Sequence, residues 1–168
     1  MKTMEAYKPW FPELSDTVKR GQFTEVQAIK VMNEYMEEEK KSPDVVVCAN
    51  DNMAIGVLKF FNMNSNNPMV KECPVTGFDD IPQARFEIPS LTTVHQPLNE
   101  IGEKSIDMII EKVKKKKVPE EVFIESRVVF RKSCGCKGGE GDFSSDEEQF
   151  RAMQMNYVHS ETLLRMVS

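Results

Sequence analysis

The sequence predicts an α/β fold, in which a Rossmann-like parallel sheet is flanked by helices. Two short apolar runs, residues 45–48 and 74–78, have the unbroken hydrophobic character of strands that are buried on both faces. Between them, residues 53–61 form a mostly apolar segment of helical length. A strand, a helix and a strand in this order imply a right-handed crossover and parallel pairing of the two strands.

The first helix expected along the chain is amphipathic and ends near residue 41. Residues 24–27 form a capping box, in which the side chains of Thr24 and Gln27 can each bond the backbone of the other. Apolar residues then recur at helical spacing, namely Ala28, Ile29, Met32, Tyr35 and Met36. The Ser42-Pro43 pair breaks the pattern and ends the helix.

A third strand and a long helix follow a loop that contains Pro82 and Pro89. Residues 91–94 are the strand, and Pro97 suits the first position of the helix, where its missing amide proton is not needed. One face of this helix is traced by Leu98, Ile101, Met108, Ile109 and Val113. Residues 122–131 contain two β-rich clusters and close the domain.

The composition changes after residue 136, which divides the chain into three parts. We expect a ligand-sensing α/β domain over residues 1–136 and a flexible linker over 137–145, because the linker is rich in glycine and charge. Residues 146–168 are expected to form an amphipathic carboxy-terminal helix that transmits a signal. Its apolar residues follow a three-four spacing at Phe150, Met153, Tyr157, Leu164 and Val167. A helix that packs back on the domain fits this pattern nearly as well.

Composition and charge exclude several classes of protein. No apolar run approaches the roughly 20 residues that span a bilayer, and residues 1–10 lack the order of a secretory signal. We therefore expect a soluble, cytoplasmic protein with no membrane partner. The net charge is −5, and the one basic run, 114–117, suits a solvated helix end. Contact with DNA is expected only through a domain that this chain does not contain.

The cysteines and catalytic motifs point to neither a metal site nor an enzyme. Cys48 and Cys73 lie in or beside apolar runs, as thiols of a reducing compartment do. Cys134 and Cys136 are separated by one residue, whereas zinc knuckles need a gap of two and a second pair. The chain also has no nucleophile elbow, phosphate loop or His-Glu-x-x-His motif. We expect no cofactor, no metal and no catalysis.

Polar residues follow each of the three predicted strands. They are Asn50 and Asp51, Asp79 and Asp80, and His95 and Gln96. Ligands of doubly wound α/β folds bind at the carboxyl ends of the strands, and carboxylates and amides can bond adjacent hydroxyls of a polyhydroxyl ligand. The pattern fits a second interpretation equally well, in which Asn50 and Asp51 cap a helix and Asp79 and Asp80 form a turn.

Three segments of the chain carry a resemblance to a known superfamily. Residues 43–56, PDVVVCANDNMAIG, resemble a segment of the lac-repressor and periplasmic sugar-binding proteins. Residues 74–80 resemble the VxGFDD strand of that superfamily, and residues 89–97 resemble its PPLTTVxQP stretch. Three ordered motifs at family-like spacing are far more specific than any one of them. The similarity extends from about residue 7 to residue 136 and covers the carboxy-terminal half of the family's sensor domain.

The resemblance implies two Rossmann-like lobes that close on a small ligand, often a sugar. It assigns Phe23 to stacking on a sugar face, Asn50 and Asp79 to bonding hydroxyls, and Gln96 to a hinge-side amide. The protein would be the effector-binding region of a bacterial transcriptional regulator or signalling protein, in which closure acts on an output domain. The alternative is a periplasmic-type solute-binding protein that serves as a transport carrier.

The resemblance also implies a homodimer and a missing lobe. Surfaces that repressors use for dimerisation match Ile55, Ile81, Arg85 and Phe86. The helix over residues 97–117 belongs, in that superfamily, to the amino-terminal lobe. We therefore expect its apolar face to be uncovered here, and to find cover through dimerisation, segment swapping or repacking.

Overall fold

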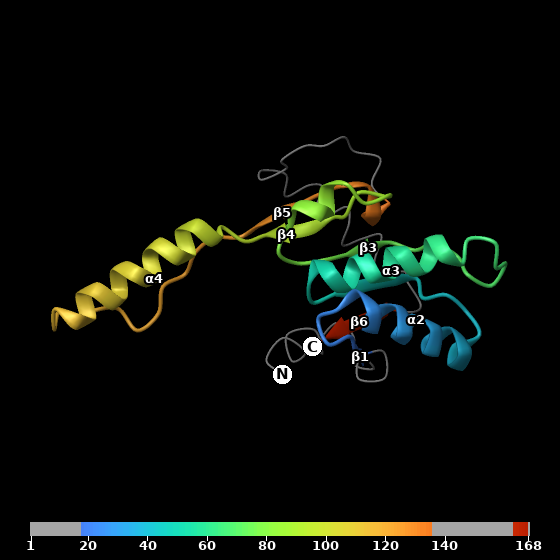
Figure 1. Ribbon diagram of the computed structural model, residues 1–168, viewed down its shortest axis with the longest axis horizontal. Coiled ribbons are helices and arrows are strands. Elements are labelled where there is room, and N and C mark those ends of the chain that lie inside the picture. The colour runs from blue at the N-terminus through green and yellow to red at the C-terminus, as the bar shows by residue number, and fades with distance from the viewer. Residues whose placement is uncertain (1–17, 136–162, 168) are drawn as a thin grey trace.

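The computed structural model describes residues 18–135 and 163–167, and it consists of an α/β body with a projecting arm (Figure 1). The helices and strands are β1 (Val18–Arg20), α2 (Glu25–Glu39), β2 (Val45–Cys48), α3 (Asp51–Met63), β3 (Val75–Thr76), the 3-10 helix η2 (Pro82–Arg85), β4 (Thr93–His95), α4 (Leu98–Val113), β5 (Arg127–Val129), the 3-10 helix η3 (Lys132–Cys134) and β6 (Leu163–Val167). Among the described residues, no helix combines the length and the hydrophobicity needed to cross a membrane.

The body is built on a four-stranded sheet in the order β1-β6-β2-β3, with every neighbouring pair parallel. Val46 of β2 is in register with Val75 of β3, so the two apolar runs of the sequence are adjacent strands. The predicted α/β class with a parallel sheet is confirmed. Because all four strands run the same way, their carboxyl ends meet at one edge of the sheet.

The last strand along the chain, β6, lies where the sequence pattern predicts a helix. Residues 163–167 form β6, which pairs Arg165 with both Val18 of β1 and Val47 of β2. The expectation of an amphipathic helix over residues 146–168 is therefore wrong for its carboxyl end. Main-chain groups of β1 and β2 need hydrogen-bond partners. Residues 163–167 provide these partners as a strand, and this pairing outweighs the helical spacing of the apolar residues. The rest of that expected helix, residues 146–162, and the linker 137–145 lie outside the described residues.

Helices α2 and α3 pack against each other, and α3 packs on β2 and β3. Thr24 caps α2 as predicted, since its Oγ1 accepts a hydrogen bond of 3.3 Å from the amide of Gln27. Gly56 allows the two helices to approach closely, because a Cβ at this position would lie 2.5 Å from the carbonyl oxygen of Glu25. The core contains Ala28, Met32, Val46, Met53, Ile55, Val57, Phe60, Val75 and Leu91.

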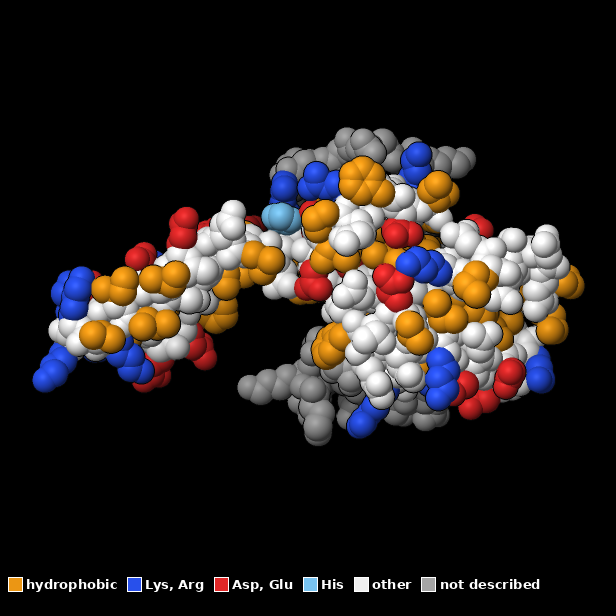
Figure 2. Space-filling model, viewed as in Figure 1, with side chains coloured by type: hydrophobic (Ala, Val, Ile, Leu, Met, Phe, Trp, Pro, Cys, Tyr) orange, Lys and Arg blue, Asp and Glu red, His pale blue; other side chains and the backbone are white. Residues whose placement is uncertain are grey.

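The arm consists of the two-stranded antiparallel ribbon β4–β5 and the helix α4, which extends away from the body (Figure 1). No residue of α4 is buried, and Ile109 and Val113 expose 62% and 77% of their surfaces. Figure 2 shows hydrophobic side chains gathered along this helix. The predicted uncovered apolar face over residues 97–117 is confirmed.

Candidate functional site

Asn50 lies between β2 and α3 and joins two loops at the carboxyl edge of the sheet. Its Oδ1 accepts a hydrogen bond of 3.0 Å from the amide of Met53, so it is the N-cap of α3. Its Nδ2 donates at 3.2 Å to the carbonyl oxygen of Phe23. The capping interpretation of Asn50 is therefore correct, and the same side chain also brings the Phe23 turn next to the end of β2.

Phe23 lies in the turn that connects β1 to α2. Both Gln22 and Phe23 have positive φ, 48° and 57°, in the left-handed region that non-glycine residues seldom adopt. The ring of Phe23 is half exposed, with 50% of the residue surface accessible. An exposed aromatic ring beside a helix cap is available for stacking on a ligand.

Asp79 and Gln96 form a second pair at the same edge. Gln96 Nε2 donates a hydrogen bond of 2.7 Å to Asp79 Oδ1, and the amide of Asp79 donates at 2.9 Å to the carbonyl oxygen of Val94. Both side-chain partners are half-buried. The structure thus brings together two of the predicted ligand residues that are far apart in the sequence.

Asp51 connects these two pairs from below. It is fully buried, and its carboxylate accepts hydrogen bonds from the hydroxyl of Thr93 at 2.5 Å and the amide of Ile81 at 2.8 Å. Its own amide donates at 2.8 Å to the carbonyl oxygen of Phe78. Burial raises the pKa of Asp51, although the bonds from Thr93 and Ile81 act in the opposite direction. The sequence places Asp51 either among the strand-end polar groups that could bind a ligand or at a helix cap, and neither interpretation predicts these buried bonds to Thr93 and Ile81.

Asp80 and Arg131 form a buried ion pair beneath the arm. Arg131 Nη2 lies 2.5 Å from Asp80 Oδ1, and His95 Nδ1 lies 2.9 Å from Asp80 Oδ2. Burial, the largest single effect, raises the pKa of Asp80, but the hydrogen bonds from Arg131 and His95 and the positive charges of Arg131 and Arg85 together outweigh it, so the pKa lies below its ordinary value. The sequence does not mark Arg131 as a partner of Asp80, because its local setting shows only the end of the β-rich segment 122–131.

The residues predicted to form a dimer interface divide into two groups. Ile55 is only 1% exposed and packs in the core beneath α3, so the prediction that it contacts a partner is wrong. Its helical position placed it on the inner face, which the resemblance alone did not reveal. Ile81 is half-buried against the same core. Arg85, the last residue of η2, and Phe86, which follows it, are both exposed, and their dimer role stays a prediction.

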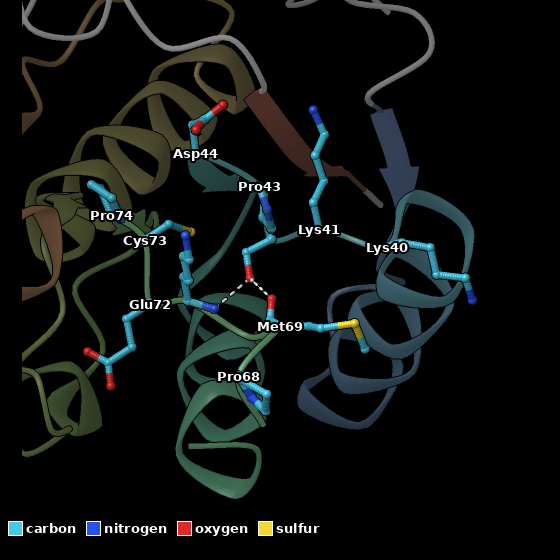
Figure 3. Close-up of a pocket in the computed structure, with 11 residues that line it drawn as sticks. Lys40, Lys41, Pro43, Asp44, Pro68, Met69, Glu72, Cys73 and Pro74 are labelled. Atoms are coloured by element: carbon cyan, nitrogen blue, oxygen red, sulfur yellow. Dashed lines mark hydrogen bonds between the residues drawn. The ribbon is translucent and has the colours of Figure 1, made fainter. Parts of the chain in front are cut away.

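A cavity of about 490 Å³ lies at the opposite edge of the sheet (Figure 3). Pro43 and Pro74, which line it, precede β2 and β3, so this is the amino edge of the strands. Within it, Ser42 Oγ accepts a hydrogen bond of 2.7 Å from the amide of Lys71. None of the four predicted ligand residues lines it. Over the part of the chain that the structure describes, no cluster of three or more His, Cys, Asp or Glu side chains could hold a metal ion.

Comparison with known proteins decides the family. Residues 7–134 match the periplasmic binding protein-like domain. The chain belongs to this family. The match confirms the resemblance carried by the three sequence motifs and the fold class that it implied.

Periplasmic binding protein-like relatives of this chain include curated repressors. The HTH-type transcriptional repressor PurR of Vibrio parahaemolyticus is 31% identical over 121 residues, which is 71% of this chain and 36% of that protein. PurR of Escherichia fergusonii is 30% identical over 135 residues, or 79% of this chain and 38% of that protein. This chain therefore spans little more than a third of the length of these relatives.

Solved structures with the same periplasmic binding protein-like fold are also transcription regulators. A LacI-type regulator from Bifidobacterium animalis is 28% identical, with a TM-score of 0.56 over 66% of this chain and 39% of that chain. A LacI family regulator from Arthrobacter, solved in complex with lactose, is 26% identical, with a TM-score of 0.55 over 66% of this chain and 41% of that chain.

Proposed function

We propose that this chain supplies one wall of the effector-binding site of a bacterial transcriptional regulator, and that the effector is a small polyhydroxyl molecule of the sugar class. The observation that carries the proposal is the Asp79–Gln96 hydrogen bond of 2.7 Å, at the same strand edge as the Asn50–Phe23 pair. One carboxylate, two amides and a half-exposed aromatic ring meet the chemical needs of a sugar.

Each of these residues retains capacity for a ligand. A carboxylate has about four acceptor positions, so the bond from Gln96 leaves Asp79 able to accept from adjacent hydroxyls. The amide of Asn50 bonds Met53 and Phe23, yet it retains one N–H and one lone pair. The Phe23 ring would cover the apolar C–H face of a sugar. This division of contacts supports a binding role rather than catalysis.

The arm supports a mechanism of lobe closure. The β4–β5 ribbon connects the body to α4, whose exposed apolar face would be covered by the part of the protein that its relatives have beyond this chain. A ligand that contacts both lobes would favour the closed state in proportion to its greater affinity for that state. DNA would be contacted by another domain of the regulator. Arg85 and Phe86 would contribute to a homodimer interface. Such a regulator would work in the cytoplasm.

The relatives favour a regulator over a transport carrier. The two curated relatives described above are transcriptional repressors, and the two solved structures are transcription regulators. Lactose in the Arthrobacter regulator supports a sugar as the first ligand class to test.

A thermal-shift screen of the natural full-length protein tests the proposal. Lactose, other mono- and disaccharides and nucleosides would be added singly, and at least one sugar should raise the midpoint of unfolding, because a ligand that binds only the folded state stabilises it. The shift should disappear in Asp79→Ala. Asp44→Ala is the matched control, since Asp44 is exposed at the amino end of β2, beside the other cavity.

Two results would overturn the proposal. One is the absence of a shift with every sugar, and the other is an equal loss of the shift in Asp44→Ala and Asp79→Ala. A response to a nucleoside alone would keep the sensor but reject the sugar class.

A further inference from the structure

Asp51 is buried beneath the wall formed by Phe23, Asn50, Asp79 and Gln96. Its residue surface is 0% exposed, so its carboxylate cannot meet a ligand on the open side. A buried carboxylate is costly unless its oxygens accept hydrogen bonds. Here the partners of Asp51 lie close in the sequence to candidate ligand residues, since Ile81 follows the Asp79 turn and Thr93 begins the strand that leads to Gln96.

Asp51 holds both ends of the turn that contains Asp79. Its amide donates to the carbonyl oxygen of Phe78 at 2.8 Å, and its Oδ2 accepts from the amide of Ile81 at 2.8 Å. Between these two contacts, Asp79 and Asp80 have positive φ values of 120° and 57°. Non-glycine residues persist in such conformations only where the surroundings hold them. The Asp51 contacts supply that restraint at the two ends of the turn, and the bonds of Asp79 to Val94 and Gln96 add to it.

Asp51 also holds the strand that leads to Gln96. Thr93 Oγ1 donates to Asp51 Oδ1 at 2.5 Å and accepts, at 3.4 Å, from the amide of Asp80. The Thr93 side chain therefore connects Asp51, the Asp79 turn and β4. Gln96 follows the last residue of β4, three positions after Thr93.

Gly77 provides the space for this arrangement. A Cβ at this position would collide with Asp51 Oδ1 and would lie 3.1 Å from the side chain of Leu91. Gly77, which directly follows β3, therefore leaves the space that the buried carboxylate of Asp51 occupies. Asn50 precedes Asp51 directly in the sequence. Asp51 is therefore next to Asn50 and is hydrogen-bonded to the segments that carry Asp79 and Gln96.

We propose that Asp51 is a positioning residue for the effector site. It does not touch the ligand, but it holds Asp79 beside Asn50 and within hydrogen-bond distance of Gln96. This rests on the proposed function of the same wall. Loss of the Asp51 bonds frees the Asp79 turn to leave its restrained conformation, and effector affinity falls although every ligand-contacting side chain is still present.

The test compares Asp51→Asn and Thr93→Val with the unchanged full-length protein. In Asp51→Asn the amide oxygen can still accept a hydrogen bond from the amide of Ile81. The NH₂ group, however, then stands where a carboxylate oxygen accepts the hydroxyl of Thr93 in the unchanged protein. Thr93→Val keeps the shape of the side chain and removes the hydroxyl. Asp44→Asn is the matched control, because it changes an exposed aspartate at the other end of β2.

The first readout is hydrogen exchange at the backbone amides of residues 79–81, measured without ligand. All three amides are hydrogen-bonded, to Val94, Thr93 and Asp51 respectively. We expect exchange there to rise by about tenfold or more in Asp51→Asn, relative to a core amide of α2 such as Val31, because one buried bond is lost. Asp44→Asn should leave both rates unchanged.

The second readout is the dissociation constant for the sugar that gives the largest thermal shift in the unchanged protein. We expect it to rise about tenfold or more in Asp51→Asn and in Thr93→Val, and to stay the same in Asp44→Asn. Affinity that is unchanged in both variants overturns the positioning role, whatever the exchange rates. A rise in exchange that is equal in α2 and in the turn also overturns it, since that pattern reports general loss of stability. If the unchanged protein binds no sugar, the proposed function fails first and this proposal fails with it.

Discussion

The guanidinium of Arg131 lies 2.5 Å from the carboxylate of Asp80, and both side chains are almost wholly buried. Asp80 follows β3, whereas Arg131 follows β5, the strand that returns from the arm. His95 of β4 bonds the other oxygen of the same carboxylate at 2.9 Å. One carboxylate therefore holds both strands of the ribbon through which the arm leaves the body.

Replacement of Asp80 by alanine should strongly destabilise the protein. The change leaves the buried charge of Arg131 without its partner, and breaking a buried pair in this way costs about 3–5 kcal/mol of the free energy of unfolding. Urea unfolding followed by circular dichroism measures the loss. Arg85→Ala serves as the control, because Arg85 is exposed and lies 3.9 Å from Asp80. Equal effects of the two variants would contradict a structural role for the buried pair.

The stability of the protein should fall in acid through Asp80. The folded state holds the pKa of Asp80 below its ordinary value, so the unfolded chain takes up the proton first. The contribution of the ion pair is therefore complete above the ordinary pKa of aspartate and is lost as the pH falls through the folded-state pKa. The difference in urea midpoint between the unchanged protein and Asp80→Asn, measured from about pH 6 to pH 3, should shrink towards acid. A difference that grows towards acid would show the opposite sign of the shift.

Gly56→Ala and Gly102→Ala should have opposite effects. A Cβ on Gly56 meets the carbonyl oxygen of Glu25 at 2.5 Å and the Cβ of Ala28 at 2.9 Å, so α2 and α3 must move apart. Overpacking of this kind costs about 1–3 kcal/mol. A Cβ on Gly102 of α4 meets nothing within 4 Å, and alanine there should stabilise the helix by about 0.5–1 kcal/mol. Thermal unfolding of both variants checks the pair, and a Gly56→Ala protein as stable as the original would mean that the helices pack less closely.

Tyr35→Phe should keep or raise the stability of the protein. Tyr35 is 3% exposed, and its hydroxyl is a buried side-chain atom without a hydrogen-bond partner among the described residues. Burial, with help from Glu39, Asp44 and Cys73, raises the pKa of this phenol to about 12. Removing an unpaired buried hydroxyl removes its desolvation penalty, of about 1–3 kcal/mol. Tyr35→Ala, which opens a cavity, should instead cost about 3–5 kcal/mol, as aromatic truncations do. A large loss in Tyr35→Phe, measured by urea unfolding, would mean that the hydroxyl has a partner.

Local pattern was enough to predict most of the α/β body. The apolar runs of β2 and β3 are short and unbroken because both faces of a parallel sheet are buried, and such runs can be recognised in the sequence. The strand-end position of Asn50 and Asp79 follows from the same reading, since carboxyl ends of parallel strands share an edge. The resemblance added Phe23 and Gln96 to the same candidate site, whereas their hydrogen bonds to Asn50 and Asp79 are seen only in the folded chain.

The features that sequence analysis missed depend on contacts between distant segments. Asp51 looks like an ordinary residue at a helix start, and only the folded chain places Ile81 and Thr93 around its carboxylate. Arg131 meets Asp80 for the same reason. Ile55 lies on the inner face of α3, where burial by α2 and the sheet prevents the partner contact that the resemblance implied. Residues 163–167 adopt a strand because β1 and β2 offer them main-chain partners, which no side-chain periodicity reveals.

The position of β6 sets the order in which the sheet can be completed during synthesis. Val18 of β1 and Val47 of β2 both pair with Arg165, so the two early strands are joined only through a strand near the end of the chain. That strand is synthesised long after β1 and β2. Until then β1 and the inner edge of β2 have unpaired main-chain groups, which are ready templates for pairing with other chains. Completion of this sheet therefore waits for residues 163–167, and it is delayed further because a long stretch of chain must close before β6 can pair with β1 and β2.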